Sequence, residues 1–486
     1  MENESLLRAS ATELAAWIRK REVRVADVVD VHIRKIEQIN PSIGAVVHDR
    51  FDEARLDAER ADKRLASRDP GDLPPFFGVP CTIKEAFAMR GFPQTGGVVN
   101  RRNRIATEDA TAVRRLREAG AIPLGVTNVS ELCMWMESNN RVYGRTKNPF
   151  DPARTAGGSS GGEGAIVGAG ASPFGLGADV GGSIRMPAFF NGVFGHKPTA
   201  GLVPNTGQFP IAENDALLFL STGPICRRAE DLFPLVQVLA GPDGHDSRTR
   251  TWTLGDPGAI RMSGLRVLDV RGNGRMPVSK DLRRAQERAK EALVDRGAVA
   301  TTRKFPNLAH SLEIWSCMMS DAGGQSFKEL LETSRDAPFD LLADFVALAT
   351  SRSDHTLPAL GLVVAERFAT ASKERVAKFV AMGRALRDEI EGALGDDGVM
   401  LYPSYASVAP KHGWALVPPV MWVYTAIVNV MGLPSTQVPL GLDANGVPLG
   451  VQVVGKRGDD ARTIAVALEL ERAFGGWTPP RGFVPA

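Results

Sequence analysis

The chain has 486 residues, of which 43% are hydrophobic and 23% charged, and its formal net charge is +2. This balance is typical of a folded globular protein and excludes an intrinsically disordered chain. Because positive charge is not in excess, we expect no nucleic-acid partner. The chain has four cysteines, Cys81, Cys133, Cys226 and Cys317. They lack the paired spacing of a metal site and fit a reducing compartment, so we expect no metal.

The N-terminal region is expected to be helical. It begins with acidic residues and no apolar segment, so the sequence predicts neither a signal peptide nor a membrane-spanning helix, and we expect a cytoplasmic protein. Residues 12–19 and 26–39 have helical patterning, and the second segment carries a stripe that should face a core: Val28, Val29, His32, Ile36 and Ile39. Asn40 and Pro41 are predicted to end this helix, because a residue before proline disfavours helical geometry.

Strand and helix patterns alternate along the rest of the chain. The pattern predicts strands at residues 79–83, 122–126 and 266–270, and helices at 111–120, 282–296 and through most of 300–390. This alternation favours an α/β sandwich built around a sheet.

Lys84 follows the first of these strands and is a candidate catalytic base. A surface lysine is protonated and cannot accept a proton. Burial disfavours the charged ammonium and lowers the lysine pKa, so a buried Lys84 held against serine hydroxyls would act as a base. An isolated lysine at the end of a strand is more often a solvated surface group, and the interpretation therefore depends on nearby serines.

Two serine-bearing glycine loops supply those serines. Glycine lets a ligand approach bare backbone N–H groups, which stabilise the oxygen of a tetrahedral intermediate. The pattern predicts an acyl-transfer enzyme with Ser183 as nucleophile and the N–H groups of Val180, Gly181, Gly182 and Ser183 as oxyanion hole. A flexible linker is the competing interpretation, but apolar runs at 165–167 and 174–176 separate the loops. We call residues 157–162 (Gly-Gly-Ser-Ser-Gly-Gly) the first serine loop and residues 179–185 (Asp-Val-Gly-Gly-Ser-Ile-Arg) the second.

Other sites fit the sequence less well. Residues 157–161 satisfy G-x-S-x-G, the nucleophile elbow of α/β-hydrolases, but an elbow needs a strand directly before it, and residues 148–156 contain two prolines and no β-branched apolar run. No G-x-x-x-x-G-K-[ST] occurs, and residues 175–180 lack the third glycine of a dinucleotide fingerprint, so no cofactor is expected. His196 lies nearest to the loops in sequence, and we interpret it as a packed residue.

These residues together resemble the amidase signature family. Lys84, the first serine loop and the second serine loop match its motifs, and the separations of Lys84, Ser159 and Ser183 are similar to those of its fatty acid amide hydrolase branch. Glu163, residues 194–199 and a tail running from 402 to 454 extend the resemblance to nearly the whole chain.

The resemblance implies the amidase signature fold, an α/β/α sandwich around a large, mixed and twisted sheet. It implies a single domain over residues 1–486. Within it we expect N-terminal helices at 10–40, a catalytic core at about 70–230, a mostly helical insertion at about 300–390 and a C-terminal return at about 398–475.

The resemblance also implies a serine amidohydrolase that uses a Ser-Ser-Lys triad and no cofactor. Ser183 would be acylated, Ser159 would relay protons, and Lys84 would be the ultimate base, with the Gly158–Ser159 peptide bond in cis. Ser159 would return a proton to the leaving amine, and water would release the acid. Esters should react as a side activity. Three residues would support the site: Ser160, Asp179 and Arg185.

The substrate is less sharply defined by the sequence. Cys133, Met134 and Trp135 stand where the family lines its acyl pocket, and residues 421–424 offer a second apolar wall. Soft apolar walls favour a hydrophobic acyl or aryl group, although plain core residues would look the same. Long-chain fatty amides, aryl amides and small aliphatic amides therefore stay open. Peripheral membrane contact and a homodimer are compatible with the sequence.

Two other functions are weighed against this one. The glutamine-hydrolysing subunit of the tRNA-dependent amidotransferase hands ammonia to a partner, but its first loop usually continues with Ser-Ala, where this chain has Gly162, Glu163 and Gly164. A non-catalytic binding protein would keep the pocket, yet all three triad residues are present.

Overall fold

The computed structural model describes residues 2–332, 339–368, 372–416 and 420–481. Within these ranges a mixed sheet of eleven strands crosses the molecule in the order β1-β3-β2-β6-β8-β7-β12-β13-β11-β9-β10. The strands are β1 (Val46–Asp49), β2 (Pro80–Lys84), β3 (Ile122–Thr127), β6 (Phe174–Asp179), β7 (Phe194–Lys197), β8 (Ser221–Cys226), β9 (Arg266–Asp269), β10 (Val299–Thr302), β11 (Gly398–Tyr402), β12 (Ser435–Leu442) and β13 (Pro448–Val454), while β4 (Asn139–Asn140) and β5 (Gly144–Arg145) form a separate hairpin.

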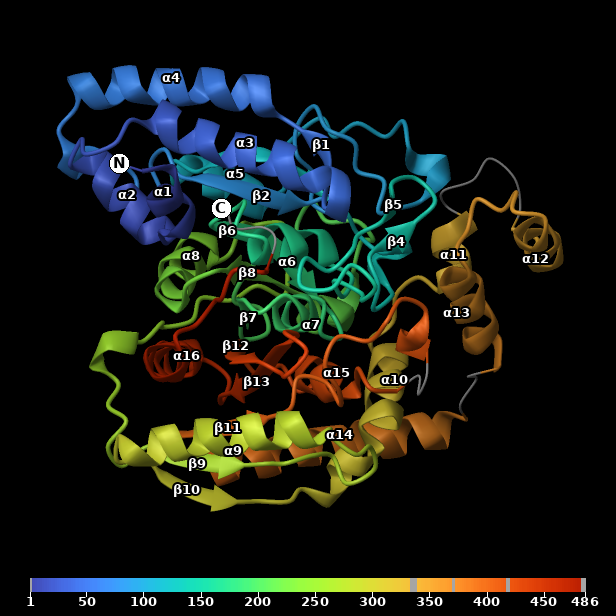
Figure 1. The fold of residues 1–486 in the computed structure, drawn as a ribbon. Coiled ribbons are helices and arrows are strands. Elements are labelled where there is room, and N and C mark those ends of the chain that lie inside the picture. Colours follow the sequence, from blue (N-terminus) through green and yellow to red (C-terminus); the bar gives the residue numbers. More distant parts are fainter. Residues whose placement is uncertain (1, 333–338, 369–371, 417–419, 482–486) are drawn as a thin grey trace.

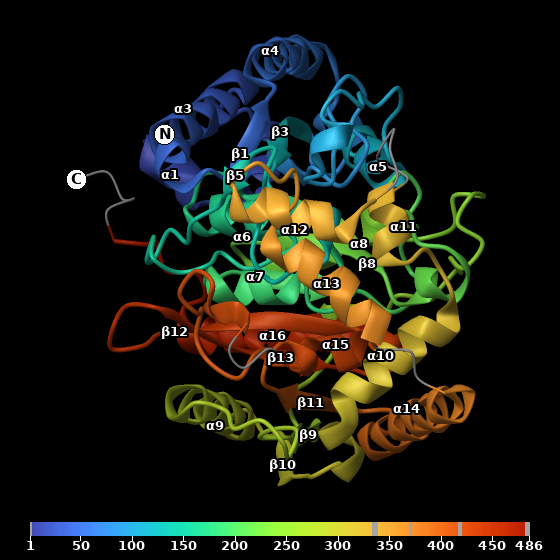
Figure 2. The same ribbon diagram turned by 90° about the vertical axis from the view of Figure 1, so that its right-hand side faces the viewer.

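Helices cover both faces of the sheet. Figure 1 shows the N-terminal helices over the β1–β3 end, and Figure 2 shows α9 and α14 on opposite sides of β9, β10 and β11. The fold is therefore the expected α/β sandwich. The helices are α1 (Asn3–Arg8), α2 (Ala11–Arg19), α3 (Val25–Ile43), α4 (Phe51–Ser67), α5 (Thr111–Glu118), α6 (Gly161–Gly168), α7 (Arg185–Phe190), α8 (Leu232–Leu239), α9 (Lys280–Asp295), α10 (Ser311–Ala322), α11 (Phe327–Glu332), α12 (Leu341–Ala349), α13 (Leu357–Phe368), α14 (Lys373–Leu394), α15 (Val423–Val430) and α16 (Asp460–Phe474).

Strand direction brings distant loops together. β2 pairs in parallel with both β3 and β6, so the carboxyl ends of these strands lie at one edge. In open α/β sheets, ligands bind outside the carboxyl ends of strands. Lys84 ends β2 and Asp179 ends β6, so the loops that follow these two residues meet at one place.

The N-terminal helices follow the sequence pattern with one correction. The predicted stripe of α3 is buried, with every member at most 3% exposed. The prediction that Asn40 and Pro41 end this helix is wrong, because it continues to Ile43 and stops at Gly44, whose φ of 59° is left-handed. The Asn40 side chain bonds the backbone of Ala45 and Val46, which holds the chain on its course past the proline.

The predicted strands and helices in the rest of the chain are present with small shifts at their ends. Helices α10 to α14 occupy the region expected to be mostly helical, although residues 333–338 and 369–371 of that region lie outside the described residues. The division of a single domain into four parts stays a prediction. In the part of the chain that the structure describes, no helix combines the length and apolar character that crossing a membrane requires.

Candidate active site

Lys84 is buried at the carboxyl end of β2, with 1% of its surface exposed. Its Nζ donates to Ser159 Oγ at 2.8 Å and lies 3.5 Å from the carbonyl oxygen of Ala178. Every residue of β2 is buried, so the strand carries the lysine into the interior. The structure thus joins two predicted site residues that stand far apart in the sequence.

The electrostatics around Lys84 favour its neutral form. Burial lowers the pKa of its amine, and the neighbouring groups Cys133, Asp179, Glu163 and Glu85 act in the opposite direction without outweighing burial. A neutral amine that shares a hydrogen bond with a serine hydroxyl can accept the serine proton.

The first serine loop holds Ser159 tightly. The Gly158–Ser159 peptide bond is cis, as expected. Ser138 Oγ donates to the Ser159 carbonyl at 3.2 Å and accepts from the N–H of Gly161 at 2.9 Å. A Cβ on Gly158 would collide with the Trp135 carbonyl oxygen, so this position requires glycine. No strand directly precedes the loop, where every residue is described, which argues against the nucleophile elbow.

Ser160 shares a backbone contact with Lys84. Its hydroxyl is 3.3 Å from the Ala178 carbonyl oxygen and 3.4 Å from the Ala178 N–H. Because the same carbonyl lies next to the Lys84 amine, Ser160 connects the first serine loop to the end of β6.

The second serine loop connects β6 to α7, and Asp179 organises it. The carboxylate of Asp179 accepts from the N–H of Gly182 at 2.6 Å and of Ile184 at 3.1 Å. It also forms an ion pair with Arg185 at 3.0 Å, in which both side chains are fully buried. Burial acts to raise the pKa of Asp179, but the charge and hydrogen bonds of Arg185, with smaller contributions from Lys197 and Asn429, together outweigh burial and lower this pKa to about 2. Ser183 lies within this loop and keeps 7% of its surface exposed.

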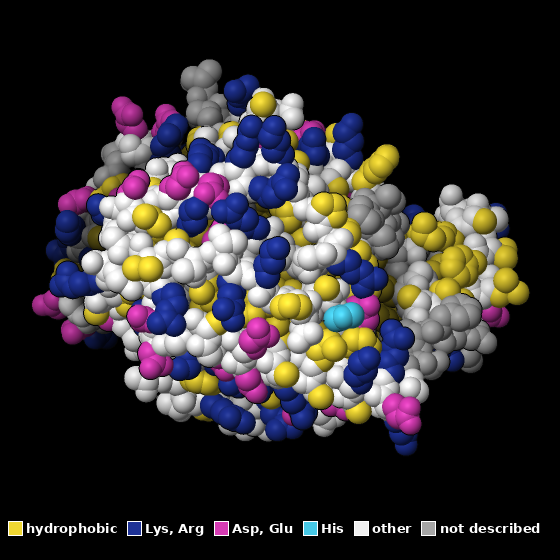
Figure 3. Space-filling model, turned by 90° about the horizontal axis from the view of Figure 1, so that it is seen from below, with side chains coloured by type: hydrophobic (Ala, Val, Ile, Leu, Met, Phe, Trp, Pro, Cys, Tyr) yellow, Lys and Arg dark blue, Asp and Glu magenta, His cyan; other side chains and the backbone are white. Residues whose placement is uncertain are grey.

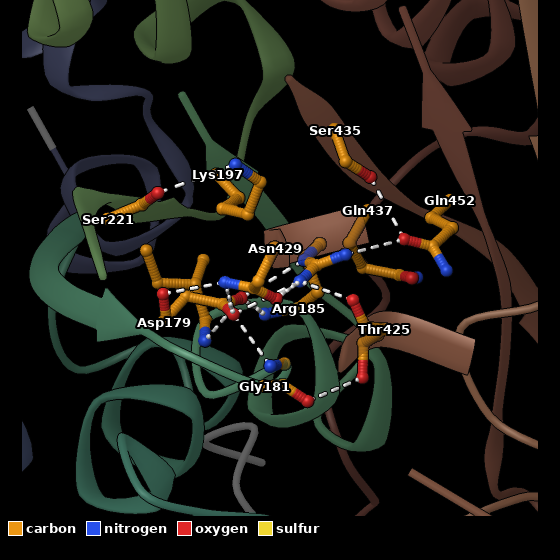
Figure 4. A network of polar contacts seen from close by, with 12 residues as sticks. Asp179, Gly181, Arg185, Lys197, Ser221, Thr425, Asn429, Ser435, Gln437 and Gln452 are labelled. Atoms are coloured by element: carbon orange, nitrogen blue, oxygen red, sulfur yellow. Dashed lines mark hydrogen bonds and ion pairs between the residues drawn. The ribbon is translucent and has the colours of Figure 1, made fainter. Parts of the chain in front are cut away.

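Arg185 ties the loop to the C-terminal part of the chain, as Figure 4 shows. Its Nη1 donates to Gln452 on β13 at 2.8 Å, and its Nη2 donates to Asn429 on α15 at 2.5 Å. The Asn429 amide donates in turn to the Asp179 carbonyl at 2.8 Å. Helix α15 and β13 therefore fix the ion pair from the side opposite the loop.

Side chains also grip the backbone of the loop. Thr425 Oγ1 donates to the Gly181 carbonyl at 2.9 Å, and Trp315 Nε1 donates to the Val180 carbonyl at 3.2 Å. Gly182 has a φ of 120°, and a Cβ there would collide with the Thr425 hydroxyl, so only glycine fits. The backbone N–H groups of the loop are thereby preorganised.

Cys133, Met134 and Trp135 lie at the end of a short helical turn, Glu131–Cys133, and each is partly buried. The segment touches the first serine loop, because the Trp135 carbonyl packs on Gly158. Burial raises the pKa of the Cys133 thiol, while Lys84 and a hydrogen bond with Ser159 act to lower it.

Met134 contacts a second apolar cluster, distinct from the main core, that joins this segment to the lobe of α11, α12 and α13. Its buried members are Val98, Leu132, Leu330, Leu331, Phe339, Leu360 and Val363. Glu131 strengthens the junction, since its carboxylate lies 2.7 Å from His355 Nδ1 and accepts from the Thr356 N–H at 2.8 Å. No sequence pattern indicated this link, because Glu131 and His355 are far apart in the chain.

Two buried polar residues near the site received no individual role from the sequence analysis. Glu163 on α6 accepts from the hydroxyls of Thr82 at 2.6 Å and Thr127 at 2.8 Å. Lys197 donates to the Pro198 carbonyl at 2.7 Å, and burial lowers the pKa of Lys197 to about 7. A charged residue in a helix of glycine and apolar residues was the available signal for Glu163.

Comparison with known proteins places this fold and site. Residues 27–464 match the family described as Amidase. The chain is 44% identical to "Fatty-acid amide hydrolase 2" of Homo sapiens, over 99% of this chain and 92% of that protein. It is 32% identical to one subunit of the glutamyl-tRNA(Gln) amidotransferase of Nitratidesulfovibrio vulgaris, over 96% of both proteins. The solved structure of 6-aminohexanoate cyclic dimer hydrolase in complex with its substrate superposes with a TM-score of 0.84 at 24% identity, covering 99% of this chain and 100% of that one.

The fold, the site and these likenesses define an enzyme that hydrolyses amide bonds. The chain belongs to the amidase family, as the match over residues 27–464 shows.

Proposed function

We propose that this amidase uses a Ser-Ser-Lys triad in which Ser183 is acylated, Ser159 relays protons and Lys84 is the ultimate base. One observation carries the proposal: the buried Lys84 amine lies 2.8 Å from the Ser159 hydroxyl, at the edge of the sheet where the second serine loop begins. No histidine takes part in this scheme.

In the proposed cycle, Ser159 passes its proton to the neutral Lys84 amine and takes the proton of Ser183, whose oxygen attacks the amide carbon. Backbone N–H groups of the second serine loop stabilise the resulting oxyanion. Because the Gly182 N–H donates to Asp179, the N–H groups of Val180, Gly181 and Ser183 would carry this role. Ser159 then returns a proton to the amine, which leaves, and water hydrolyses the acyl-enzyme to the acid.

We propose a hydrophobic acyl or aryl group on the substrate. Met134 packs against an apolar cluster, and Trp422 lies over Gly181, about 3.6 Å from the place of an added Cβ. Trp315 contacts Trp422 edge to face at 4.8 Å between ring centroids. The relative named fatty-acid amide hydrolase 2 supports a fatty acyl chain over an aryl or small aliphatic group. Esters should react as well, because alkoxide is an easier leaving group.

Substitution of the base tests the proposal. Lys84→Ala is expected to lose amide hydrolysis more severely than hydrolysis of a matched ester, because expulsion of an amine needs the returned proton. Lys63→Ala, on the exposed face of α4, serves as control. Hydrolysis that survives Lys84→Ala with unchanged pH dependence would remove Lys84 from the mechanism.

Glutamine hydrolysis for an amidotransferase is the second candidate function, since the relative from that enzyme is 32% identical. Glutaminase activity that rises when a tRNA-charging partner is added would favour it. Tight binding of amides and esters without turnover would instead favour a non-catalytic binding protein.

We further propose that the enzyme acts in the cytoplasm and touches membranes peripherally through α12. All four cysteines are free, which suits a reducing compartment. On α12, Leu342 is 75% and Val346 is 59% exposed, and Figure 3 shows hydrophobic side chains on the lobe where Figure 1 places this helix. Leu342→Glu with Val346→Glu should reduce cosedimentation with lipid vesicles, whereas Val294→Glu, on the exposed face of α9, should not.

A homodimer is the oligomeric state proposed from the sequence. Sedimentation velocity on the purified chain measures its mass in solution directly, and a monomer at all concentrations would contradict the proposal.

A further inference from the structure

The carboxyl group of Glu163 lies on the same face of β2 and β3 as the side chain of Lys84, the proposed base. Thr82 precedes Lys84 by two residues on β2, so both side chains project from the same face, about 7 Å apart along the strand. Thr127 pairs with Lys84 in the register of β2 and β3. Because Glu163 accepts from the hydroxyls of both threonines, its carboxyl group lies on the face from which Lys84 reaches Ser159.

The fold leaves a space for this carboxyl group. Gly175 on β6 lies opposite Thr82, and a Cβ at Gly175 would collide with Glu163 Oε2. Glu163 itself is completely buried. The position of the Glu163 carboxyl group is therefore fixed by β2, β3, β6 and α6.

Glu163 has few groups that would stabilise a negative charge. Two hydroxyls donate to it, and no ion pair of Glu163 is found among the described residues. Burial raises the pKa of Glu163 to about 8, while the two hydroxyls and Lys84 act to lower it. Cys81 on β2 has its pKa raised by burial and contributes no charge.

The other titratable groups around Lys84 have different hydrogen-bond and ion-pair partners from those of Glu163. Asp179 is paired with Arg185. Glu85 accepts from the backbone N–H groups of Thr95 and Gly96 and from a tyrosine hydroxyl, and burial raises its pKa. Burial also raises the pKa of Cys133. Among the described residues, the hydrogen bonds that Glu163 accepts come from neither a cation nor a backbone N–H, which distinguishes it from the other two carboxyl groups.

We propose that Glu163 is a positioning residue that holds the ends of β2 and β3 next to Lys84 and titrates together with it, so that the Lys84 amine gives up its proton most readily while Glu163 keeps one. This inference rests on the proposed function, because it takes Lys84 as the base. A carboxylate at this position would favour the ammonium form of Lys84, which cannot accept the Ser159 proton. The two groups titrate as a coupled pair, and one proton on the pair is productive only when it resides on Glu163.

Glu163→Gln tests the inference, because the amide keeps the size of the side chain and still bonds hydroxyls but cannot ionise. We measure kcat/KM for an amide and the rate of fluorophosphonate labelling of Ser183 across pH. The acidic limb of both profiles should move to lower pH by roughly 0.5–1 unit, since no carboxylate can then form beside Lys84 and favour its ammonium. A matched control is Asp231→Asn, a buried carboxyl group that accepts from the backbone N–H groups of Ala11 and Thr12 at the start of α2.

A second variant guards against misfolding. Thr127→Val removes one hydroxyl donor to Glu163 with little change of shape, so the uncharged acid is favoured and the limb should move in the same direction. Profiles of Glu163→Gln that superimpose on those of the wild type, or move to higher pH, would overturn the inference. If Lys84→Ala is inactive while Glu163→Gln titrates as the wild type does, the inference alone fails. If Lys84→Ala titrates normally, the proposed function fails.

Discussion

Asp179→Asn should both destabilise the fold and disable the second serine loop. The carboxylate of Asp179 accepts from Arg185 Nε and Nη2, both at 3.0 Å, and from the N–H groups of Gly182 and Ile184. Asparagine removes the charge and brings an NH₂ group into a site that contains only donors. Removing one partner of a buried ion pair costs about 3–5 kcal/mol, because the other charge is left uncompensated.

The pH dependence of this loss has a definite sign. The pKa of Asp179 falls from 3.8 to about 2 in the folded protein, so the ionised carboxylate stabilises the native state by about 2 kcal/mol at neutral pH. Because the folded pKa is depressed, this contribution is fully present above the unfolded pKa and is lost as pH falls toward 2. The difference in unfolding free energy between wild type and Asp179→Asn should therefore narrow between pH 5 and pH 2.

Urea unfolding followed by tryptophan fluorescence measures the free energy, and amide hydrolysis at neutral pH measures the function. Hydrolysis should fall by at least about 100-fold, the effect of losing one oxyanion donor. Asp281→Asn, an exposed acid in the first turn of α9, is the matched control and should change neither quantity. A loss below about 1 kcal/mol with activity retained would refute the reasoning that the ion pair braces the loop.

Three other substitutions probe the loop, the apolar cluster and the helical lobe. Gly182→Ala should reduce amide and ester hydrolysis alike by at least about 100-fold, because an added Cβ collides with Thr425 and displaces the loop. Steady-state rates of the variant that equal those of the wild type would contradict this. Met134→Ala should raise KM for long acyl chains by about tenfold and leave acetyl amides unchanged, which a chain-length series measures. Glu131→Gln should lower the melting temperature by several degrees, because it weakens the hydrogen bonds that the Glu131 carboxyl group makes with His355 Nδ1 and the Thr356 N–H. An unchanged calorimetric Tm would disprove the link.

The parts of the site that lie on short motifs could be predicted from the sequence. Ser159 and Ser183 stand in glycine loops whose spacing is visible along the chain, and Lys84 follows a strand that alternation reveals. The apolar stripe of α3 was likewise evident, because burial follows helical periodicity. The end of α3 could not be predicted. The tendency of a helix to end before proline is outweighed by the contacts of Asn40 and by the left-handed Gly44.

The groups that surround the triad could not be found in this way. Glu163 meets Thr82 and Thr127 only after α6 packs on the sheet, and Glu131 meets His355 only after the helical lobe docks. Each contact depends on three-dimensional packing between residues that are distant in sequence. Lys84 can act as a base only if it is buried. The sequence indicated this requirement but could not show that the lysine is buried.

The central claim is that Ser183 is the nucleophile and Lys84 its ultimate base. Treatment with a fluorophosphonate, mapping of the modified peptide by mass spectrometry, and repetition on Lys84→Ala test it most directly. The account predicts label on Ser183, formed much more slowly in the variant. Label on Ser159 or Ser160, or label on Ser183 at an unchanged rate in Lys84→Ala, would contradict it.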